Sequence, residues 1–218
     1  MRINVVESVL KSNDAVAREN RQRLDAAGVL AINIMSAPGS GKTLLLEKTI
    51  PVLAPGCRCA VLVGDLQTTR DAQRLGGLGV QVTQINTGTG CHLSATHVAE
   101  GLSGLDLRAI GILFIENVGN MVCPAAFDLG EHRRAVLLSA PEGDDKVAKY
   151  PTLFLKADVI LLTKVDLLGV LDYSFDRVMD DLSHINTAAP VLRVSTRTGE
   201  GFDAWLAWLR HQRAARKA

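Results

Sequence analysis

The sequence has almost no net charge and no long hydrophobic run. Its 24 Lys and Arg residues against 23 Asp and Glu residues leave a formal net charge of +1, which gives no reason to expect a nucleic-acid surface or an acidic partner. No apolar run is long enough to span a bilayer, and residues 1–4 lead into a mixed polar stretch unlike a signal peptide. We therefore expect a cytoplasmic protein that binds neither nucleic acid nor membranes.

Cysteine is scarce, and neither cysteine nor histidine forms the dense run that would mark a metal store. The four cysteines are Cys57, Cys59, Cys91 and Cys123. Free thiols are the ordinary state in an intracellular chain, metal binding comes next, and the count does not choose between them. We expect Cys57 and Cys59 to belong to a turn and the start of a strand.

Apolar runs alternate with helical patterns along most of the chain. With 218 residues, 47% of them hydrophobic, the sequence is long enough for one α/β domain with a buried core. Strands are expected at residues 29–35, 60–63, 80–85, 110–115, 135–138, 159–162 and 191–194. Helices are expected at 43–53, 71–78, 93–102, 145–155, 176–184 and from 202 to the end. This order predicts βαβ units and a doubly wound, mostly parallel sheet flanked by helices.

The first 28 residues are polar, with apolar residues at helical spacing. We expect residues 1–28 to form an N-terminal helical extension and residues 29–218 to form the main domain. Ser12 or Asn13 could cap the helix, and Gly28 could end it. No linker or repeat separates the two parts, so they should fold as one unit.

A glycine-rich segment lies between the first expected strand and the next helix. It reads Ser36-Ala37-Pro38-Gly39-Ser40-Gly41-Lys42-Thr43. This matches the phosphate-binding pattern G-x-x-x-x-G-K-[ST] except that Ser36 replaces the first glycine. Backbone N–H groups of the loop and the helix start would surround phosphate oxygens, Lys42 would reach the β and γ phosphates, and Thr43 would bind Mg²⁺. We expect a P-loop NTPase fold; the alternative is a strand-to-helix turn without a ligand.

Thr163-Lys164-Val165-Asp166 follows a later apolar strand and indicates which base is bound. The Asp166 carboxylate could accept hydrogen bonds from N1–H and the 2-amino group of guanine, whereas adenine has neither donor. The tetrapeptide resembles the N-K-x-D signature of GTPases with Thr163 in place of Asn, and the Lys164 stem would cover the base. Ser195 and Thr196 follow the last strand, where GTPases place a second base-contacting loop. Ordinary strand-end turns are the alternative for both segments.

Two carboxylates end apolar runs and should face the ligand crevice, because the carboxyl ends of parallel strands lie at one edge of the sheet. Asp65 and Glu116 could hold Mg²⁺ or its waters together with Thr43. Gly119 could follow the γ-phosphate with its N–H group and couple hydrolysis to loop movement. The alternative is a pair of solvated strand-end acids.

Cys91 and His92 follow a glycine-rich loop, and Cys123 lies just beyond Gly119. Both loops leave the carboxyl ends of strands, so they could meet near the nucleotide. Two thiolates and an imidazole suit Zn²⁺ or Ni²⁺, with a fourth position left for water or a dimer partner. The alternative is three unrelated residues, with Cys91 and Cys123 packed as small hydrophobic side chains.

The combined motifs resemble those of the HypB family, SIMIBI-class P-loop GTPases that help deliver nickel to the large subunit of [NiFe]-hydrogenase. The motifs are Gly64-Asp65-Leu66-Gln67-Thr68, Ile85-Asn86-Thr87-Gly88 with Gly90-Cys91-His92-Leu93, Phe114-Ile115-Glu116-Asn117-Val118-Gly119-Asn120 with Val122-Cys123-Pro124, and Glu142-Gly143 to Lys149-Tyr150-Pro151. The resemblance implies slow GTP hydrolysis and a nickel or zinc site at a dimer interface. Its metal ligands would be Cys91, His92 and Cys123.

The resemblance also implies partners. It predicts a GTP-dependent homodimer, a nickel-carrying accessory protein like HypA, and the hydrogenase large subunit. Leu167, Leu168 and Leu171 resemble the family's dimer contact, and a buried helix face is the competing explanation. We expect the cofactors to be GTP or GDP, Mg²⁺, and Ni²⁺ or Zn²⁺.

The function favoured by these residues is that of a metal-regulated GTPase acting as a nickel metallochaperone. Lys42 would stabilise charge on the transferring phosphoryl group, Asp65 and Glu116 would position Mg²⁺ and the attacking water, and Gly119 would sense the γ-phosphate. No arginine finger or catalytic Gln is evident, so turnover should be slow. The alternatives are a GTP-dependent docking timer with a structural metal, a related nickel- or cobalamin-type maturation GTPase, and a P-loop nucleotide kinase. Asp166 argues against the kinase.

Overall fold

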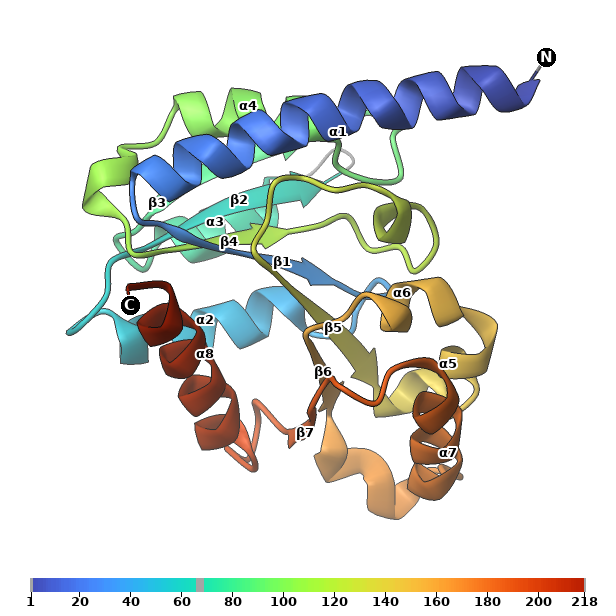
Figure 1. Cartoon of the computed structure of the whole chain (residues 1–218). Coiled ribbons are helices and arrows are strands. Elements are labelled where there is room, and N and C mark those ends of the chain that lie inside the picture. The colour runs from blue at the N-terminus through green and yellow to red at the C-terminus, as the bar shows by residue number, and fades with distance from the viewer. Residues whose placement is uncertain (1, 66–68, 218) are drawn as a thin grey trace.

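A single parallel sheet lies between two layers of helices in the computed structural model, which describes residues 2–65 and 69–217 (Figure 1). The strands are arranged in the order β3-β2-β4-β1-β5-β6-β7. They are β1 (Leu30–Met35), β2 (Cys59–Asp65), β3 (Gln81–Asn86), β4 (Ile112–Glu116), β5 (Arg133–Ser139), β6 (Val159–Thr163) and β7 (Val191–Val194). Every strand expected from the sequence overlaps one of these, which confirms the doubly wound parallel fold.

The central strands are continuous apolar runs because helices cover both faces of the sheet. All residues of β1, β4 and β6 are buried. Successive side chains of β1 point to opposite faces: Ile32 and Ile34 join one core cluster, whereas Ala31 and Met35 join clusters on the other side. Both faces of the sheet therefore carry hydrophobic core, one cluster on the first face and two on the other.

One face is covered by α2 (Lys42–Leu53), α3 (Arg70–Gly76) and α8 (Phe202–Lys217). Trp205 of α8 is fully buried there and donates a hydrogen bond to Thr49 of α2, with 2.9 Å between Nε1 and Oγ1. The other face is covered by α1 (Arg2–Ala26), α4 (Ala95–Ser103), α5 (Lys146–Lys149), α6 (Pro151–Leu155) and α7 (Phe175–Ile185). Figure 1 shows these two layers on either side of the strands.

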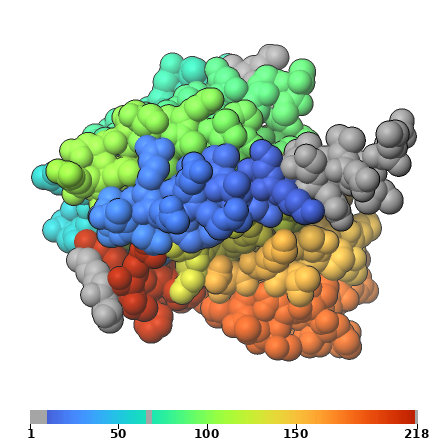
Figure 2. All heavy atoms as spheres, turned by 45° about the horizontal axis from the view of Figure 1, so that its top comes forward, coloured from blue at the N-terminus to red at the C-terminus, as the bar shows by residue number. Residues whose placement is uncertain are grey.

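Helix α1 runs across the layer that contains α4 (Figure 2). Gly28 follows its end with φ of 67°, as expected of a helix-terminating glycine. The expectation that Ser12 or Asn13 caps the helix is wrong, because α1 begins at Arg2. Asn13 is instead buried: its Nδ2 donates to the Asp128 carbonyl at 2.7 Å, and its Oδ1 accepts from the Ala95 N–H at 2.9 Å.

The single helix expected at residues 145–155 is wrong as well. Tyr150 has φ of −128° and ψ of 52° and separates α5 from α6. Pro151 is the cause, because proline disfavours helical backbone in the residue before it and suits the first position of a new helix. Short 3₁₀ turns not expected from the sequence also occur, namely η1 (Leu107–Ala109), η2 (Cys123–Ala126), η3 (Ala140–Glu142) and η4 (Val165–Val170).

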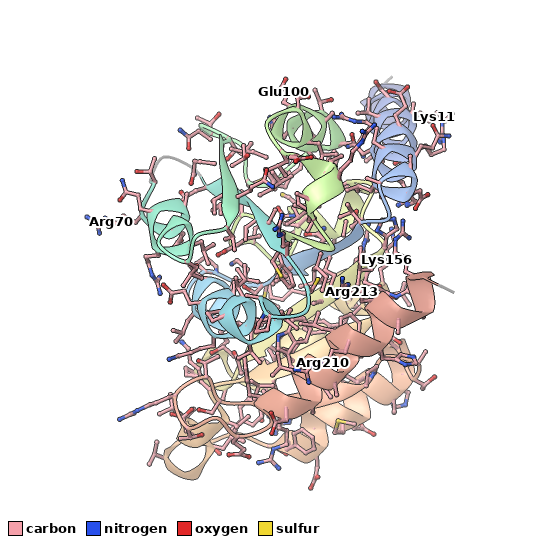
Figure 3. The ribbon with its side chains drawn as sticks, turned by 90° about the vertical axis from the view of Figure 1, so that its left-hand side faces the viewer. Lys11, Arg70, Glu100, Lys156, Arg210 and Arg213 are labelled. Carbon is pink, nitrogen blue, oxygen red and sulfur yellow. The ribbon has the colours of Figure 1, made fainter. Side chains whose placement is uncertain are left out.

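Charged side chains project from the outer surfaces of the helices. Figure 3 shows Lys11 of α1, Arg70 of α3 and Glu100 of α4 pointing away from the sheet. None of the helices within the described ranges combines the length and the apolar character that crossing a membrane would require.

Candidate nucleotide pocket and metal centre

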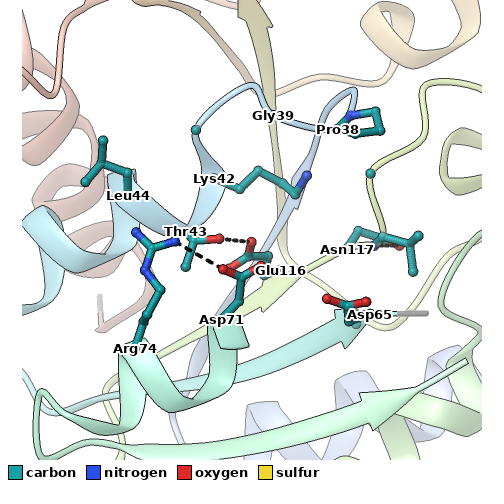
Figure 4. Close-up of a pocket in the computed structure, with 14 residues that line it drawn as sticks. Pro38, Gly39, Lys42, Thr43, Leu44, Asp65, Asp71, Arg74, Glu116 and Asn117 are labelled. Carbon is teal, nitrogen blue, oxygen red and sulfur yellow. Dashed lines mark hydrogen bonds and ion pairs between the residues drawn. The ribbon is translucent and has the colours of Figure 1, made fainter. Parts of the chain in front are cut away.

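A cavity of about 470 Å³ lies at the carboxyl edge of the sheet, beside β1, β2 and β4 (Figure 4). The chain order reverses at β1, whose neighbours are β4 and β5, and ligands of doubly wound sheets bind at such a point. The cavity is lined by the loop after β1, the start of α2, and residues at or just beyond the ends of β2 and β4, among them Pro38, Gly39, Gly41, Lys42, Thr43, Asp65, Glu116 and Gly119. Eight of the residues predicted for the nucleotide and Mg²⁺ thus surround one cavity.

The P-loop has the conformation that its glycines allow. Gly39 and Gly41 have φ of 76° and 98°, which other L-residues rarely adopt. Lys42 is buried, and its Nζ donates to Ser36 Oγ at 3.0 Å. Ser36, where the usual pattern has glycine, therefore provides an acceptor for the lysine. Burial lowers the pKa of Lys42 despite the nearby Glu116 carboxylate.

Glu116 and Thr43 form the centre of the cavity. The Thr43 hydroxyl donates to Glu116 Oε1 at 2.7 Å, while Oε2 is buried and has no hydrogen-bond partner among the described residues. Burial raises the pKa of Glu116 to about 7, although Thr43 and Lys42 act in the opposite direction. A buried carboxylate oxygen without a donor, next to a threonine hydroxyl and Asp65, is a set of hard oxygen ligands that suits Mg²⁺.

Two of the residues predicted to contact the base, Thr163 and Lys164, are joined to the P-loop by direct hydrogen bonds. Thr163 Oγ1 donates to the Ser40 carbonyl at 2.8 Å, and Lys164 Nζ donates to the Gly39 carbonyl at 2.7 Å. Lys164 has φ of 58°, the sole non-glycine residue of the described chain with a positive φ, and such strained backbone is often found at functional sites. The turn after β6 is thus held against the P-loop by Thr163 and Lys164.

The two base loops also meet each other. Ser195 is buried, and its hydroxyl donates to Asp166 Oδ1 at 2.6 Å; Thr196 follows in the same loop. The structure therefore brings together the segments that the sequence assigned separately to guanine recognition. Their contact with a base stays a prediction.

Cys91, His92 and Cys123 come together from two loops. Their ligand atoms all lie within 4.8 Å of one another, and no other such group of three occurs in the part of the chain that the structure describes. The two sulfur atoms are 2.8 Å apart, and the His92 ring stacks on Phe127 with 3.9 Å between centroids. All three candidate ligands are partly exposed, so an ion could reach them from solvent.

The environment of Cys123 and His92 favours their neutral forms. The neighbouring Cys91 thiol raises the pKa of Cys123, and desolvation lowers the pKa of His92. A metal ion would replace the thiol protons and bind the neutral imidazole. Cys57 and Cys59 are buried elsewhere, and Cys59 opens β2, as expected for a turn and strand start.

At two glycines, the pocket lies in close contact with the loops that carry Cys91, His92 and Cys123. A Cβ atom on Gly119 would lie 2.8 Å from Pro38 Cα, so the loop that leads to Cys123 passes directly against the P-loop. A Cβ atom on Gly64 would lie 2.7 Å from the Leu93 side chain, next to His92. Both close approaches require glycine.

The sequence reasoning missed Asp71 and Arg74, which line the pocket from α3. Arg74 donates from Nε and Nη2 to Glu47 at 2.9 and 2.6 Å, and from Nη1 to Asp71 at 3.2 Å. Their spacing of one helical turn, directly after the Asp65 motif, is the signal that could have revealed them. Leu66, Gln67 and Thr68 of that motif lie outside the described residues.

Glu142 was quoted within a motif, but its contact was not foreseen. It accepts a hydrogen bond from the Ser40 hydroxyl of the P-loop. Burial raises the pKa of Glu142, although the hydrogen bond from Ser40 opposes this shift. The P-loop is therefore supported by Glu142 of η3 and by Thr163 of β6 as well as by its own strand.

Comparisons with known proteins agree with this geometry. The family model described as CobW/HypB/UreG, nucleotide-binding domain, matches residues 30–193. The hydrogenase maturation factor HypB of Azotobacter vinelandii is 48% identical over 214 residues, covering 98% of this chain and 71% of that protein. The factor of the same name from Escherichia coli K12 is 45% identical over 213 residues, covering 98% and 73%.

Solved structures show the same relationship. HypB from Helicobacter pylori, crystallised in complex with nickel, superimposes with a TM-score of 0.90 at 38% identity, covering 94% of this chain and 96% of that one. HypB from Archaeoglobus fulgidus gives 0.88 at 38% identity, covering 94% and 100%. A signal recognition particle protein from Aeropyrum pernix, at 15% identity and a TM-score of 0.58 over 87% of this chain and 48% of that one, shares the fold alone.

Proposed function

The chain belongs to the HypB hydrogenase maturation factors of the CobW/HypB/UreG nucleotide-binding family, and we propose that it is a GTP-hydrolysing metallochaperone that holds nickel for insertion into [NiFe]-hydrogenase. The observation that carries the proposal is the cluster of Cys91, His92 and Cys123 on loops that adjoin the nucleotide pocket. Zinc fits the same ligands and is the competing ion.

The preference for GTP rests on Asp166. Its carboxylate is oriented by the Ser195 hydroxyl, with 2.6 Å between Oδ1 and Oγ, and retains acceptor capacity for the N1–H and 2-amino groups of guanine. Lys164 is held over the P-loop by its bond to the Gly39 carbonyl, so its stem would cover one face of the base. An adenine nucleotide would offer Asp166 neither of these two donors.

Hydrolysis would depend on positioned charge. Lys42 and the P-loop N–H groups stabilise charge on the transferring phosphoryl group. Thr43, Glu116 and Asp65 would hold Mg²⁺, which neutralises phosphate charge when bound. Gly119 would follow the γ-phosphate, because it already lies against Pro38. Arg74 is engaged with Glu47, so no free arginine is positioned among the described pocket residues, and slow turnover is expected.

Nickel is the cargo of this proposal. Two thiolates and an imidazole are soft and borderline ligands that bind Ni²⁺ as well as Zn²⁺, and three ligands leave a position that an acceptor can use to take the ion. Because Cys123 lies four residues beyond Gly119, a change at the γ-phosphate would alter the separation of the ligands. Nucleotide state would thereby control the affinity for nickel.

Family membership supports a proposal about the partners. We propose a GTP-dependent homodimer through Leu167, Leu168 and Leu171, supported by the exposed neighbour Val170, of which 81% is accessible. Leu168 also packs against the core, so Leu167 and Leu171 are the stronger candidates for the contact. A HypA-like nickel carrier and the hydrogenase large subunit would be the donor and the acceptor.

A nickel titration tests the proposal. We expect wild-type protein to bind Ni²⁺ with different affinities in GDP and in a non-hydrolysable GTP analogue, and Cys123→Ala to lose most of the affinity in both states. Cys59→Ala is the matched control, because Cys59 is buried in β2 and should leave binding unchanged. Equal nickel affinities in the two nucleotide states, or no effect of Cys123→Ala, would contradict the proposal.

A further inference from the structure

Three buried polar side chains and one half-buried arginine form a continuous chain between the nucleotide pocket and the loops that carry Cys91, His92 and Cys123. The members are Asn33 of β1, Asn117 after β4, and Glu131 and Arg134 around the start of β5. Asn33, Asn117 and Glu131 are 0%, 1% and 5% exposed. Burying polar groups is unfavourable unless they are hydrogen-bonded. The hydrogen-bond partners of these four side chains therefore show which segments of the protein they link.

Asn117 provides the branch to the His92 loop. It lines the pocket directly after Glu116 (Figure 4). Its Oδ1 accepts from the Leu93 N–H at 3.2 Å and from the Val118 N–H at 3.0 Å. One carboxamide therefore holds the backbone next to His92 and the backbone that leads to Gly119.

Asn33 continues the chain through the sheet. Asn117 Nδ2 donates to Asn33 Oδ1 at 3.2 Å, and Asn33 Nδ2 donates to Glu131 Oε1 at 3.3 Å. Asn33 lines neither the cavity nor the metal cluster. Its bonds therefore link the two regions without contacting either ligand.

Arg134 provides the branch to the Cys123 loop. Its Nε donates to Glu131 Oε1 at 2.6 Å, and its two terminal nitrogens donate to the carbonyls of Phe127 at 3.2 Å and Ala125 at 3.5 Å. Ala125 lies in η2, which begins at Cys123, and the Phe127 ring stacks on His92. The network therefore reaches both loops that supply the candidate ligands.

We propose that Asn33, Asn117, Glu131 and Arg134 are positioning residues that transmit the nucleotide state to Cys91, His92 and Cys123. A γ-phosphate beside residues 116–119 would shift Asn117, which moves the Leu93 backbone directly and the Cys123 loop through Asn33 and Arg134. The inference rests on the proposed function for the identity of the ion. It goes beyond that function by naming the side chains that carry the coupling.

Two measurements on the full chain test this inference. The first is Ni²⁺ titration with GDP and with a non-hydrolysable GTP analogue. The second needs no metal: the rates at which iodoacetamide alkylates Cys91 and Cys123 in the same two nucleotide states, read by peptide mass. Asn33→Ala breaks the network at its centre. The matched control is Asn186→Ala, whose carboxamide bonds the backbone at Phe154, Ala157, Ala188 and Ala189.

We expect the wild-type ratio of nickel affinities to fall in the range of about 5- to 150-fold that is typical of coupled sites. Asn33→Ala cuts the branch to the Cys123 loop and leaves the direct contact between Asn117 and Leu93 in place. It should therefore reduce this ratio and the nucleotide dependence of Cys123 alkylation, while the protein still binds nickel and nucleotide. Asn186→Ala should keep both wild-type ratios. If Asn33→Ala keeps the wild-type ratios too, the network is structural only and the inference is wrong.

A second variant covers the case in which Asn33→Ala does not fold. Arg134→Lys retains a cation beside Glu131 but loses the paired contacts to Ala125 and Phe127, and it should reduce both ratios. The two readouts also separate the two proposals. Nucleotide-dependent alkylation that needs Asn33, without any nickel binding, would support the network and refute the nickel function. If the alkylation rates in wild type are the same with GDP and with the GTP analogue, the proposal that the network transmits the nucleotide state is wrong.

Discussion

The nucleotide pocket and the candidate metal cluster of Cys91, His92 and Cys123 are built in different ways. In the pocket, functional side chains bond one another: Lys42 donates to Ser36, and Thr43 donates to Glu116. All four are less than 9% exposed. In the metal cluster, the ligands are partly exposed and stand on loops. Apart from the contacts among the ligands, those loops are held mainly through backbone groups and one ring stack.

The difference shows which region can move. A site whose side chains fix one another is preorganised for one ligand, whereas ligands held through their backbones can change their spacing when a neighbouring loop shifts. The cluster that would have to release an ion is the adjustable one. Variants in the pocket should therefore change chemistry strongly and locally, and variants at the contact between the regions should have smaller effects on both.

Lys42→Ala should give the largest effect. Removing a donor that stabilises transition-state charge costs about 100- to 1,000-fold in turnover. Nickel binding without nucleotide should stay at the wild-type level, because Lys42 is not a ligand of the cluster. GTP turnover and nickel titration check this, with Lys48→Ala on the exposed side of the same helix as control. A matching loss of nickel affinity would show that the two regions are not separable.

Glu116 should make the stability of the Mg²⁺-free protein depend on pH. Its folded pKa is raised from 4.5 to about 7, so the folded state binds the proton more tightly than the unfolded state. The contribution of Glu116 to stability is then largest below pH 4.5 and is lost as the pH rises to about 7 and above, by about 3 kcal/mol in total. Denaturation of Glu116→Gln should lack this fall, whereas Glu100→Gln, an exposed site on α4, should keep it. If the free energy of unfolding falls with pH equally in wild type and in Glu116→Gln, the raised pKa of Glu116 is refuted.

Asp166→Asn tests whether the preorganised region extends to the base. Hydrogen bonds to a charged acceptor contribute about 1.5–3 kcal/mol, so GDP affinity should fall roughly ten- to a hundredfold. Affinity for xanthosine diphosphate should rise, because the new amide can donate to the oxygen that replaces the 2-amino group. Nucleotide titration measures both. Asp172→Asn, exposed and nearby, is the control, and an unchanged preference for guanine would remove Asp166 from the site.

Gly119→Ala tests the contact between the two regions and should have the smallest effect. The added methyl would meet Pro38 Cα at 2.8 Å, and such overpacking costs about 1–3 kcal/mol. We expect a lower midpoint of thermal unfolding and weaker nucleotide binding. Gly76→Ala has open space around the added carbon and should be neutral or slightly stabilising. Identical behaviour of the two variants would mean that the loops do not depend on this contact.

The strands and the P-loop could be predicted from the sequence because their signals are local. A strand buried on both faces is a continuous apolar run, and the phosphate loop is a contiguous pattern of residues. Apolar periodicity also predicted most helices. It failed where a single residue overrides it, as Pro151 does when it divides the helix expected at residues 145–155.

Other parts could not be predicted, because their partners are distant in the sequence. Asn33 and Asn117 are 84 residues apart, and neither carries a local mark of its partner. Asn13 looked like a cap because of its residue type, yet its side chain bonds Asp128 and Ala95 across the fold. Cys91 and Cys123 could be predicted only as residues of two loops at the same edge of the sheet; their contact is a tertiary property.

The central claim is that the nucleotide pocket and the metal cluster are energetically coupled, and reciprocity tests it most directly. If nucleotide state changes nickel affinity by some factor, nickel must change the ratio of GTP-analogue to GDP affinity by the same factor. The measurement is a titration of wild-type protein with each nucleotide, with and without Ni²⁺. The account predicts equal factors from the two directions, both different from one. A ratio of GTP-analogue to GDP affinity that is the same with and without Ni²⁺ would contradict the account.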